Sequence, residues 1–417
     1  MDGPDTPEGP AEPSFPRQGP DPAGVKRRLD ARLAVTVLPT RRRSRRPGTG
    51  RALVAGLLAA AGVVVVVQTG PDQVLKSTEA AAGNRSSVAP STASRHSPPA
   101  PPAPPAPPAL QAKGTVTLAF GGDVHAEGGS GAALRAGLPS IREVLSRADV
   151  AVLNLETAVT NAGAPARKKF TFRAPASVLT QLKSAGVDVV TVANNHGIDY
   201  GRDGLLDTLA ASAATGLPVV GIGLDEDQAY APHVIKVRGQ RIAVLGATQV
   251  LDDNLAAAWT AGPGSPGLAS AKREERLVEE VARAREVADT VVVYLHWGRE
   301  LDPCPLPQQQ VLARRLVAAG ADVVVGSHAH VLLGGGWLDG AYVDYGLGNF
   351  VFGARSQETT RSGVLTLNVS GRTVTAAEWT PARVRSGAPV LLTGKPAQQA
   401  VTDKARRRGC TDLSATP

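Results

Sequence analysis

The sequence has few cysteines and little excess charge in its long central part, and both scarcities exclude classes of protein. Cys304 and Cys410 are the only two cysteines in 417 residues, and neither stands in a CxxC motif of the kind found in thiol redox centres. The formal net charge is +8, of which residues 1–51 contribute +5 and the last 16 residues +2. The 350 residues between them are nearly neutral, which argues against a nucleic-acid-binding surface.

The N-terminal region predicts a basic tail followed by a membrane anchor. Residues 1–51 carry 11 Lys/Arg against 6 Asp/Glu and are rich in Pro and Gly, so we expect a disordered cytoplasmic tail. Residues 52–70 begin with 16 consecutive apolar or Gly residues that follow an Arg cluster. Basic flanks stay inside, which predicts a single-pass signal anchor with a cytoplasmic N-terminus and everything after it outside. A buried helix and a cleaved signal peptide, including twin-arginine export, are the alternatives.

The remaining chain divides into a linker, a domain and a tail. Residues 71–113 are rich in Pro and Ala, and eight prolines between Pro98 and Pro108 predict a stiff polyproline II stalk, with an SH3-type ligand as the alternative. Residues 114–385 have the pattern of a globular domain, and we expect residues 386–417 to be a flexible C-terminal tail. Both cysteines would lie outside the cell, where they could pair, although two separate thiols are equally compatible with the sequence.

Strand and helix patterns alternate through residues 114–385, which predicts an α/β layered domain. The predicted strands are Thr115–Phe120, Val150–Leu153, Val187–Ala193, Val234–Val237, Arg241–Gly246, Val291–Leu295, Asp322–Val325, Tyr342–Leu347, Val364–Val369 and Thr373–Trp379. The predicted helices are Ser140–Ala148, Ala176–Ala185, Gly204–Ala214, a long charged helix and Gln308–Ala319. On the charged helix, Leu277, Val281, Ala284 and Ala288 fall on one face.

Five polar clusters directly follow hydrophobic runs in this domain. They are Asp123-Val124-His125, Asn154-Leu155-Glu156, Asn194-Asn195-His196, His296 to Glu300, and Gly326 to His330. Sites in α/β folds lie beyond the carboxyl ends of the strands. Imidazole, carboxylate and carboxamide groups are suited to a borderline divalent metal ion. The clusters therefore favour metal-assisted chemistry.

Two pairs of residues, each separated by a single residue, are the simplest candidate metal ligands. Asp123 and His125 can turn toward one ion as the strand opens into a loop, although Asp123 could instead cap a helix. His328 and His330 have the same spacing in a loop bounded by glycines. Two histidines so placed favour metal binding over a single satisfied core histidine.

The other clusters each have a structural alternative. His296 is a candidate ligand, but Trp297 could simply pack over it. Glu300 could hold an imidazole tautomer or be a solvated side chain. Glu156 is the one carboxylate of its cluster, and a charge at a helix start is its alternative role.

The stretch from Asn194 to Gly201 is the most specific of the five. Asn195 offers a neutral oxygen ligand, and the adjacent His196 can donate a proton or stabilise developing charge. A helix-capping turn would explain one Asn and one Gly but not the whole set. His233 lies outside the clusters and is interpreted as structural, and His96 lies in the stalk.

Six ordered motifs resemble the capsule-synthesis CapA family. They are GGDVHAEG, NLETAVT, ANNHGIDYG, YLHWGRE, GSHAHVLLGG and YGLGNFVF, spanning about Thr115 to Phe352. The resemblance implies a calcineurin-like metallophosphatase fold, a four-layer α/β/β/α sandwich with two divalent metal ions at the strand ends. Mn, Zn or Fe would serve in such a site.

The resemblance also implies roles for individual residues. Asp123, His125 and His330 would bind one metal ion and Asn195, His296 and His328 the other, with Glu156 bridging. Asp123, Glu156 and His196 are thereby the predicted catalytic residues, and His196 would act beside the leaving group. Phosphatases of this fold use a bridging Asp, whereas this chain has Glu156.

Two hypotheses of function follow from the resemblance. The first is a membrane-anchored, extracytoplasmic protein of capsule or poly-γ-glutamate synthesis or export, with metal-dependent hydrolase or transferase activity on phosphoester or amide bonds. Its partners would be an anionic surface polymer or its precursor, the membrane, and other membrane subunits of a polymer synthase. The second is a non-catalytic polymer-binding or assembly subunit. A cytoplasmic phosphatase is a third hypothesis.

Overall fold

The structure, a computed structural model, describes residues 114–417. The predicted tail, anchor and linker at 1–51, 52–70 and 71–113 lie outside the described residues. Within residues 114–417, no helix combines the length and the apolar character needed to cross a membrane.

The first of two large sheets is built around a central parallel group of strands. Along the sheet its strands are β18 (Ala388–Leu391), β17 (Thr373–Arg385), β16 (Arg361–Ser370), β1 (Val116–Val124), β2 (Val150–Leu155), β5 (Val189–Thr191) and β6 (Val219–Val220), with β15 (Asn349–Val351) also paired to β1. The strands β1, β2, β5 and β6 run parallel, and β16 to β18 are antiparallel. All six residues of β2 are buried, as expected for a strand covered on both faces.

The second sheet has six strands and the same parallel character at its centre. Its order is β13 (Gly335–Leu338), β14 (Ala341–Asp344), β12 (Val323–Ser327), β11 (Thr290–His296), β9 (Gln240–Thr248) and β8 (His233–Val237). The strands β14, β12, β11 and β9 are parallel, whereas β13 and β8 are antiparallel edges. Two further pairs, β3 (Ala158–Val159) with β4 (Arg173–Ala174) and β7 (Ile222–Gly223) with β10 (Gly267–Leu268), lie in the connections.

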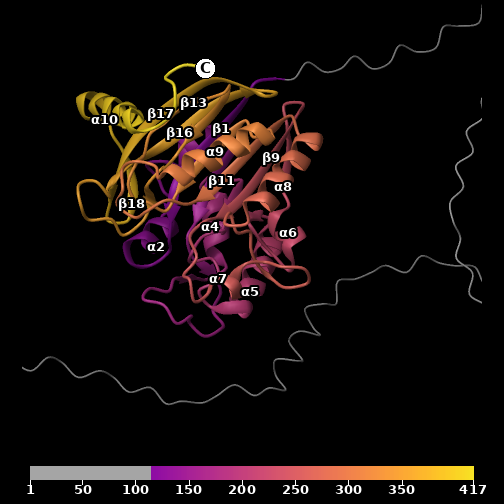
Figure 1. The fold of residues 1–417 in the computed structure, drawn as a ribbon. Coiled ribbons are helices and arrows are strands. Elements are labelled where there is room, and N and C mark those ends of the chain that lie inside the picture. Colours follow the sequence, from indigo (N-terminus) through magenta and orange to yellow (C-terminus); the bar gives the residue numbers. More distant parts are fainter. Residues whose placement is uncertain (1–113) are drawn as a thin grey trace, which may run out of the picture. The chain divides into compact units, whose positions relative to one another are not determined.

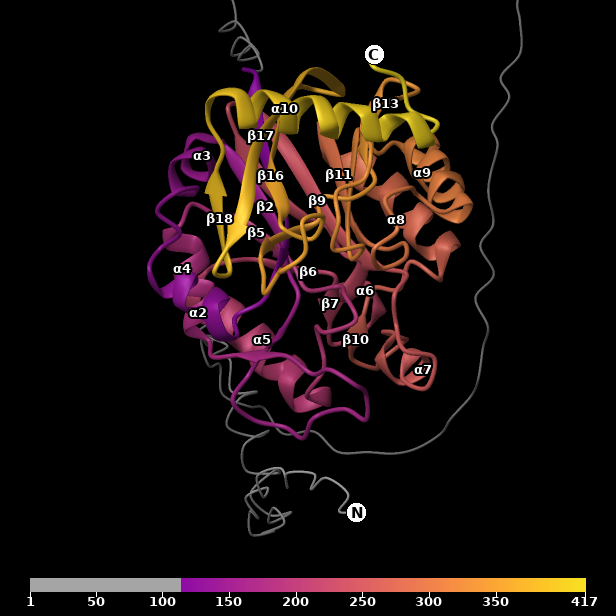
Figure 2. The same cartoon turned by 90° about the vertical axis from the view of Figure 1, so that its left-hand side faces the viewer.

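Helices cover the outer faces of both sheets (Figures 1 and 2). On the first sheet they are α2 (Gly128–Arg135), α3 (Arg142–Arg147), α4 (Ser177–Ser184) and α5 (Gly201–Thr215), and on the second α8 (Glu274–Val287) and α9 (Pro307–Ala319). The short helices α6 (Glu226–Tyr230) and α7 (Ala256–Trp259) belong to the connections.

Strand alternation sorts the core into three apolar layers. On β1, Leu118 and Phe120 face the second sheet, whereas Ala119 faces the helices. On β11, Tyr294 faces the first sheet and Val293 faces the outer helices. The layers therefore run helices, sheet, sheet, helices, and the predicted α/β class is confirmed.

The first strand is longer than its hydrophobic run predicts. It continues from Phe120 through two glycines to Val124, so that Asp123 lies within the strand. The register against β2 shifts between Phe120 and Asp123, and β15 begins to pair with β1 at Asp123, beyond Phe120, the last residue paired with β16. The extra pairing keeps the polar end of the strand extended.

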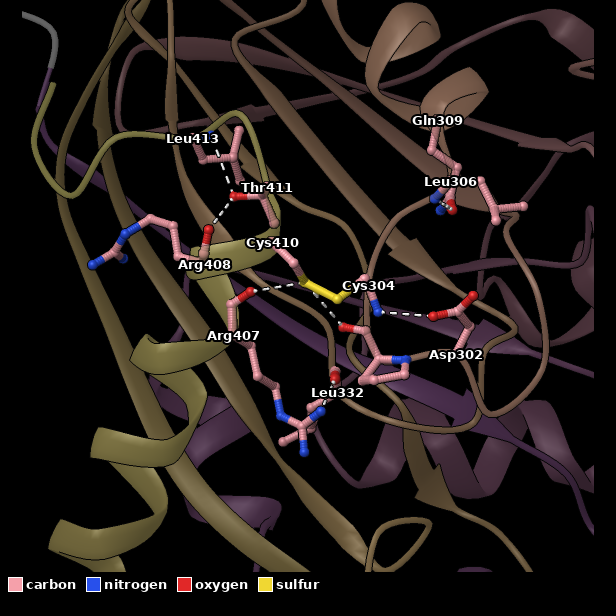
Figure 3. Close-up of a disulfide and its surroundings, with 11 residues drawn as sticks. Asp302, Cys304, Leu306, Gln309, Leu332, Arg407, Arg408, Cys410, Thr411 and Leu413 are labelled. Carbon is pink, nitrogen blue, oxygen red and sulfur yellow. Dashed lines mark hydrogen bonds between the residues drawn. A yellow bond between two sulfur atoms is a disulfide. The ribbon is translucent and has the colours of Figure 1, made fainter.

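The expectation of a flexible tail at residues 386–417 is wrong. This segment forms β18, the helix α10 (Gly394–Arg406) and a 3-10 turn, η1 (Arg407–Cys410). Cys410 is disulfide-bonded to Cys304 (Figure 3), and the buried Lys404 ammonium lies 2.8 Å from a carboxylate oxygen of Asp344. The polar sequence gave no local sign of order because the partners are distant in the chain.

The C-terminal segment also braces the chain that follows His330. Arg407 donates to the carbonyl of Leu332 at 2.8 Å, and Lys404 donates to that of Leu333 at 2.6 Å. Arg408 reaches the carbonyl of Gly335 at 3.2 Å. Figure 3 shows Arg407 directed at Leu332 beside the disulfide. The C-terminus thus stabilises the loop that carries two of the candidate ligands.

Replacing both cysteines by serine (Cys304→Ser with Cys410→Ser) should destabilise the protein. The disulfide joins residues 106 positions apart, so its loss should lower the free energy of unfolding by about 2–4 kcal/mol. Thermal and denaturant unfolding with and without reductant would measure the change. Reductant should destabilise the native protein but not the double variant; equal stability of the two proteins would contradict the bracing role.

Candidate metal centre

The candidate ligands meet where parallel strands of both sheets end. Asp123 lies near the end of β1 and Glu156 directly follows β2 in the first sheet. His296 ends β11, and His328 directly follows β12 in the second sheet. The two sheets therefore present their carboxyl ends to one site, as predicted from the clusters.

The backbone is constrained on both sides of this site, next to Asp123 and at the two loop histidines. A Cβ at Gly122 would lie 1.8 Å from the carbonyl oxygen of Gly348, so only glycine lets the strand place Asp123 here. On the other side, His328 and His330 have φ angles of 95° and 56°. Such left-handed conformations cost on the order of 1–3 kcal/mol each and cluster at functional sites.

Two groups of side chains have the spacing of metal ligands. Glu156, His296 and His328 form one group, and Asp123, Glu156 and His330 form the other. Within each group the potential ligand atoms lie within 4.8 Å of one another. Glu156 belongs to both groups, and the bridging role that the family resemblance implies for it stays a prediction.

The surroundings of Glu156 are suited to a bound cation, because the chain itself supplies no hydrogen-bond donor to this carboxylate. The side chain is fully buried, and neither carboxylate oxygen has a hydrogen-bond partner. The closest imidazole nitrogens to Oε1 are Nε2 of His296 at 3.5 Å and Nε2 of His330 at 4.0 Å. A buried, unpaired carboxylate is costly. Imidazole and carboxylate donors together suit borderline divalent ions.

The pKa values of the candidate ligands are shifted by burial and by the nearby carboxylates. Burial lowers the pKa of His296 well below its ordinary value and that of His328 to about 3, so both are neutral imidazoles able to bind metal. Burial, together with Asp123, raises the pKa of Glu156. Burial also disfavours a charged His330, but Glu156 and Asp123 outweigh it and raise that pKa to about 9. The carboxylates thus attract positive charge to this point.

Asn195 joins the site and His125 stands beside it. The side-chain oxygen of Asn195 lies 2.8 Å from Nε2 of His296, at the edge of the first group. His125 belongs to neither group: its ring stacks on Phe172 with centroids 5.3 Å apart and meets the ring of Phe352 edge-on at 4.3 Å. Its predicted ligand role stays a prediction, and the structure places it in an aromatic wall.

His196 is held by two charged residues to which the sequence analysis gave no role. Its Nδ1 lies 2.6 Å from Oδ2 of Asp199, whose other oxygen is 3.1 Å from the ammonium of Lys168. Asp199 is fully buried. The aspartate three residues after His196 in one motif was a readable signal. No such signal marked Lys168, because it comes from a loop outside that motif.

Two buried asparagines connect His196 to the ligand groups. Asn154 donates to Oδ1 of Asp123 at 2.8 Å and lies 3.2 Å from Nδ1 of His296. Asn194 donates to the side-chain oxygen of Asn154 at 2.9 Å and accepts the backbone N–H of His196 at 3.0 Å. The network fixes ligand orientation, and its members stood in the predicted clusters without an assigned role.

Three further residues lie beside or outside the ligand groups. Asn349 places its side-chain oxygen 2.9 Å from Nδ1 of His330 and donates to that residue's carbonyl, which orients the imidazole. Glu300 is exposed and raises the pKa of both Glu156 and His330. His233 lies half-buried in β8, outside both ligand groups.

The sequence places these side chains in a known family. The profile of the family described as bacterial capsule synthesis protein PGA_cap matches residues 117–354. The chain belongs to this family.

Three curated relatives are similar to the chain in sequence. The chain is 33% identical over 232 residues to the capsule biosynthesis protein CapA of Bacillus anthracis, covering 55% of each chain. It is 36% identical over 209 residues to the PGA biosynthesis protein CapA of Bacillus subtilis, covering 50% of this chain and 54% of the relative. A probable polyglutamine synthesis accessory protein of Mycobacterium tuberculosis is 31% identical over 189 residues, covering 44% of this chain and 50% of the relative. The chain spans about half the length of the curated relatives it matches.

Solved structures resemble the chain more distantly. A phosphatase from Mycoplasma pneumoniae is 14% identical with a TM-score of 0.43, covering 69% of this chain and 97% of that one. The sulfate thiohydrolase SoxB of Thermus thermophilus is 15% identical with a TM-score of 0.39, covering 72% and 61%. The family assignment rests on the sequence matches.

Replacing the buried carboxylate, Glu156→Leu, should stabilise the metal-free protein while removing metal binding. The substitution takes away a fully buried carboxyl group whose oxygens have no hydrogen-bond partner, which should raise the free energy of unfolding in chelator by about 1–3 kcal/mol. Denaturant unfolding with chelator and with added Mn²⁺ would measure both effects.

The exposed Glu286 on α8 offers the matched control. Glu286→Leu should change the free energy of unfolding by less than about 0.5 kcal/mol and keep the stabilisation by Mn²⁺. If Glu156→Leu were destabilising in chelator, or still stabilised by Mn²⁺, the assignment of Glu156 would be wrong.

Proposed function

We propose that this protein is a membrane-anchored, extracytoplasmic member of its family that acts in the synthesis or export of a poly-γ-glutamate-type capsule polymer. In this proposal it is a hydrolase or transferase of phosphoester or amide bonds that uses two divalent metal ions. The observation that carries the catalytic part is the buried Glu156 shared by two ligand groups, beside a His196–Asp199 pair. Membership of the bacterial capsule synthesis family supports a capsule polymer as the molecule on which the protein acts.

The donor set divides between two ions. Asp123 and His330 would hold one ion, and His296 and His328, with Asn195, the other, with Glu156 between them. Two bound ions of this kind activate water and neutralise charge on the reacting group. Mn, Zn or Fe would suit these ligands.

The longer side chain of Glu156 is compatible with a bridging role. Its Oε1 lies within 4.0 Å of imidazole nitrogens from both ligand groups. In this proposal the glutamate would take the bridging role that the family resemblance gives to aspartate in phosphatases of this fold.

His196 supplies proton transfer in this proposal. Asp199 accepts from Nδ1 of His196 and so fixes the tautomer, which leaves Nε2 as the nitrogen that exchanges a proton. Burial lowers the pKa of His196, although Asp199 opposes the shift. Lys168 holds the other oxygen of Asp199 and also donates to the carbonyl of Asn195, which ties the pair to the ligands.

The disulfide supports a location outside the cytoplasm. Disulfides persist mainly in oxidising compartments, and Cys304–Cys410 is such a bond. The apolar run in residues 52–70 follows an Arg cluster and would anchor the protein with its N-terminus inside.

Metal analysis of the purified full-length protein should find about two divalent ions per chain. The double variant His328→Ala with His330→Ala should lose both the ions and turnover of phosphoesters or γ-glutamyl peptides in a mass-spectrometric screen. His233→Ala is the control and should keep both. Metal bound without turnover of any substrate would instead indicate a non-catalytic polymer-binding or assembly subunit.

Asp199→Asn should separate proton transfer from metal binding. Loss of the carboxylate removes the orientation of His196 but none of the ligands, so metal content should stay unchanged while kcat falls by about 100-fold or more. The acidic limb of the pH–kcat profile should move as well. Asp253→Asn, at a fully exposed carboxylate, is the control, and a parallel loss of metal in Asp199→Asn would contradict this role.

A further inference from the structure

The segment 166–173 lies directly against the His196–Asp199 pair. The N–H of Ala166 donates to the carbonyl of Asp199 at 2.7 Å, and the N–H of Phe172 donates to its carboxylate at 2.6 Å. Lys168 is buried in its ion pair with the same carboxylate, and the Phe172 ring centroid is 4.2 Å from that of His196. The segment is therefore fixed over the site at three points.

The residues between these inner contacts face solvent. Arg167, Lys169, Phe170 and Arg173 are exposed, and Phe170 is the single aromatic among the large exposed apolar side chains of the described chain, at 58% exposure. The Lys169 ammonium lies 5.1 Å from the Phe170 ring centroid, and the Arg173 guanidinium lies 5.0 Å from that of Tyr200.

None of these three cations pairs with a carboxylate within residues 114–417. Elsewhere in the domain, Arg276, Arg315 and Arg361 each contact acidic side chains. Three cations without a carboxylate partner thus lie within residues 167–173, in a segment that is itself anchored to the site.

A second loop brings another free cation to the same place. Phe352 meets His125 edge-on, and the N–H of Gly353 lies 3.1 Å from Nε2 of that histidine. The opposite contact of His125 is Phe172, so the two loops meet across one ring. Arg355, two residues beyond Gly353, is exposed and has no carboxylate partner in the described chain.

Acidic side chains also occur near the site. Glu127 is exposed two residues after His125, Glu300 is exposed and acts on the pKa of Glu156, and Asp253 lies 3.9 Å from Lys272. The cations of the two loops therefore lie in a region that also carries acidic side chains. A local cationic strip beside acidic neighbours favours one oriented chain over a general attraction to polyanions.

We propose that Arg167, Lys169, Arg173 and Arg355, with Phe170, form a rim that binds a flexible polycarboxylate and presents it to the metal centre. The inference rests on the proposed function and adds the surface that recognises the polymer. A γ-linked glutamyl chain carries one carboxylate per residue for the cations and methylene groups that pack against Phe170. Exposed ion pairs are individually weak and screened by salt, so binding comes from several contacts made at once.

Fluorescence anisotropy of a labelled poly-γ-glutamate with the full-length protein tests the rim. The triple variant Arg167→Gln, Lys169→Gln and Arg173→Gln should raise Kd about tenfold or more at low salt, because three weak contacts are lost together. The salt dependence of Kd should become shallower. Titrations with and without chelator measure binding apart from catalysis.

The control triple variant removes the same charge at exposed cations elsewhere, Arg135→Gln, Lys236→Gln and Lys395→Gln. These residues also lack carboxylate partners in the described chain, and Kd should change less than about twofold. Equal weakening in both triple variants would overturn the rim, because net charge alone would explain it. Metal content and the thermal midpoint should match the native protein in both.

Two further outcomes separate this inference from its rivals. If the rim variant lost binding to vesicles of phosphatidylcholine and phosphatidylglycerol but kept its affinity for the polymer, the strip would be a membrane contact and the proposal would fall. If the native protein bound the polymer through the rim yet turned over no substrate, the catalytic proposal would fail while the rim stood.

Discussion

The structure depends on one costly arrangement, a carboxylate buried without a hydrogen-bond partner at the junction of two sheets. Glu156 is fully buried, and both of its oxygens lack partners. Imidazole nitrogens from two separate ligand groups approach it within 4.0 Å. A chain that keeps such a group pays for it in stability, and the gain is a site ready to hold cations. The neutral imidazoles of His296 and His328 and the hydrogen-bonded asparagines surround the same site.

The layered fold explains how this point is held. Parallel strands end at a common edge, and here two sheets bring their ends together, so rigid strands place Asp123, Glu156 and His296. The remaining candidate ligands come from a loop with left-handed backbone at His328 and His330. That loop continues into residues to which the C-terminal segment donates hydrogen bonds. Packing thus compensates for local strain at the site.

Much of this arrangement could be predicted from the sequence, because the signals were local. Hydrophobic runs that end in polar clusters marked the strands and their carboxyl ends, and they identified Asp123, Glu156, Asn195, His296 and the two loop histidines. What failed or was missed depended on contacts between distant segments. The C-terminal order rests on Cys304 and Asp344, the support of His196 on Lys168, and the orientation of His330 on Asn349. The position of His125 follows from aromatic neighbours on two other loops.

The central claim is that Glu156 lies between two metal ions that share it. Electron paramagnetic resonance of the Mn²⁺-loaded full-length protein tests this directly, since two ions joined by a carboxylate are magnetically coupled. The account predicts the multiline signal of a coupled pair in the native protein, and in Glu156→Ala its loss, with only the signal of unbound Mn²⁺ left. Only isolated Mn²⁺ signals in the native protein, or a coupled signal that survives Glu156→Ala, would contradict it.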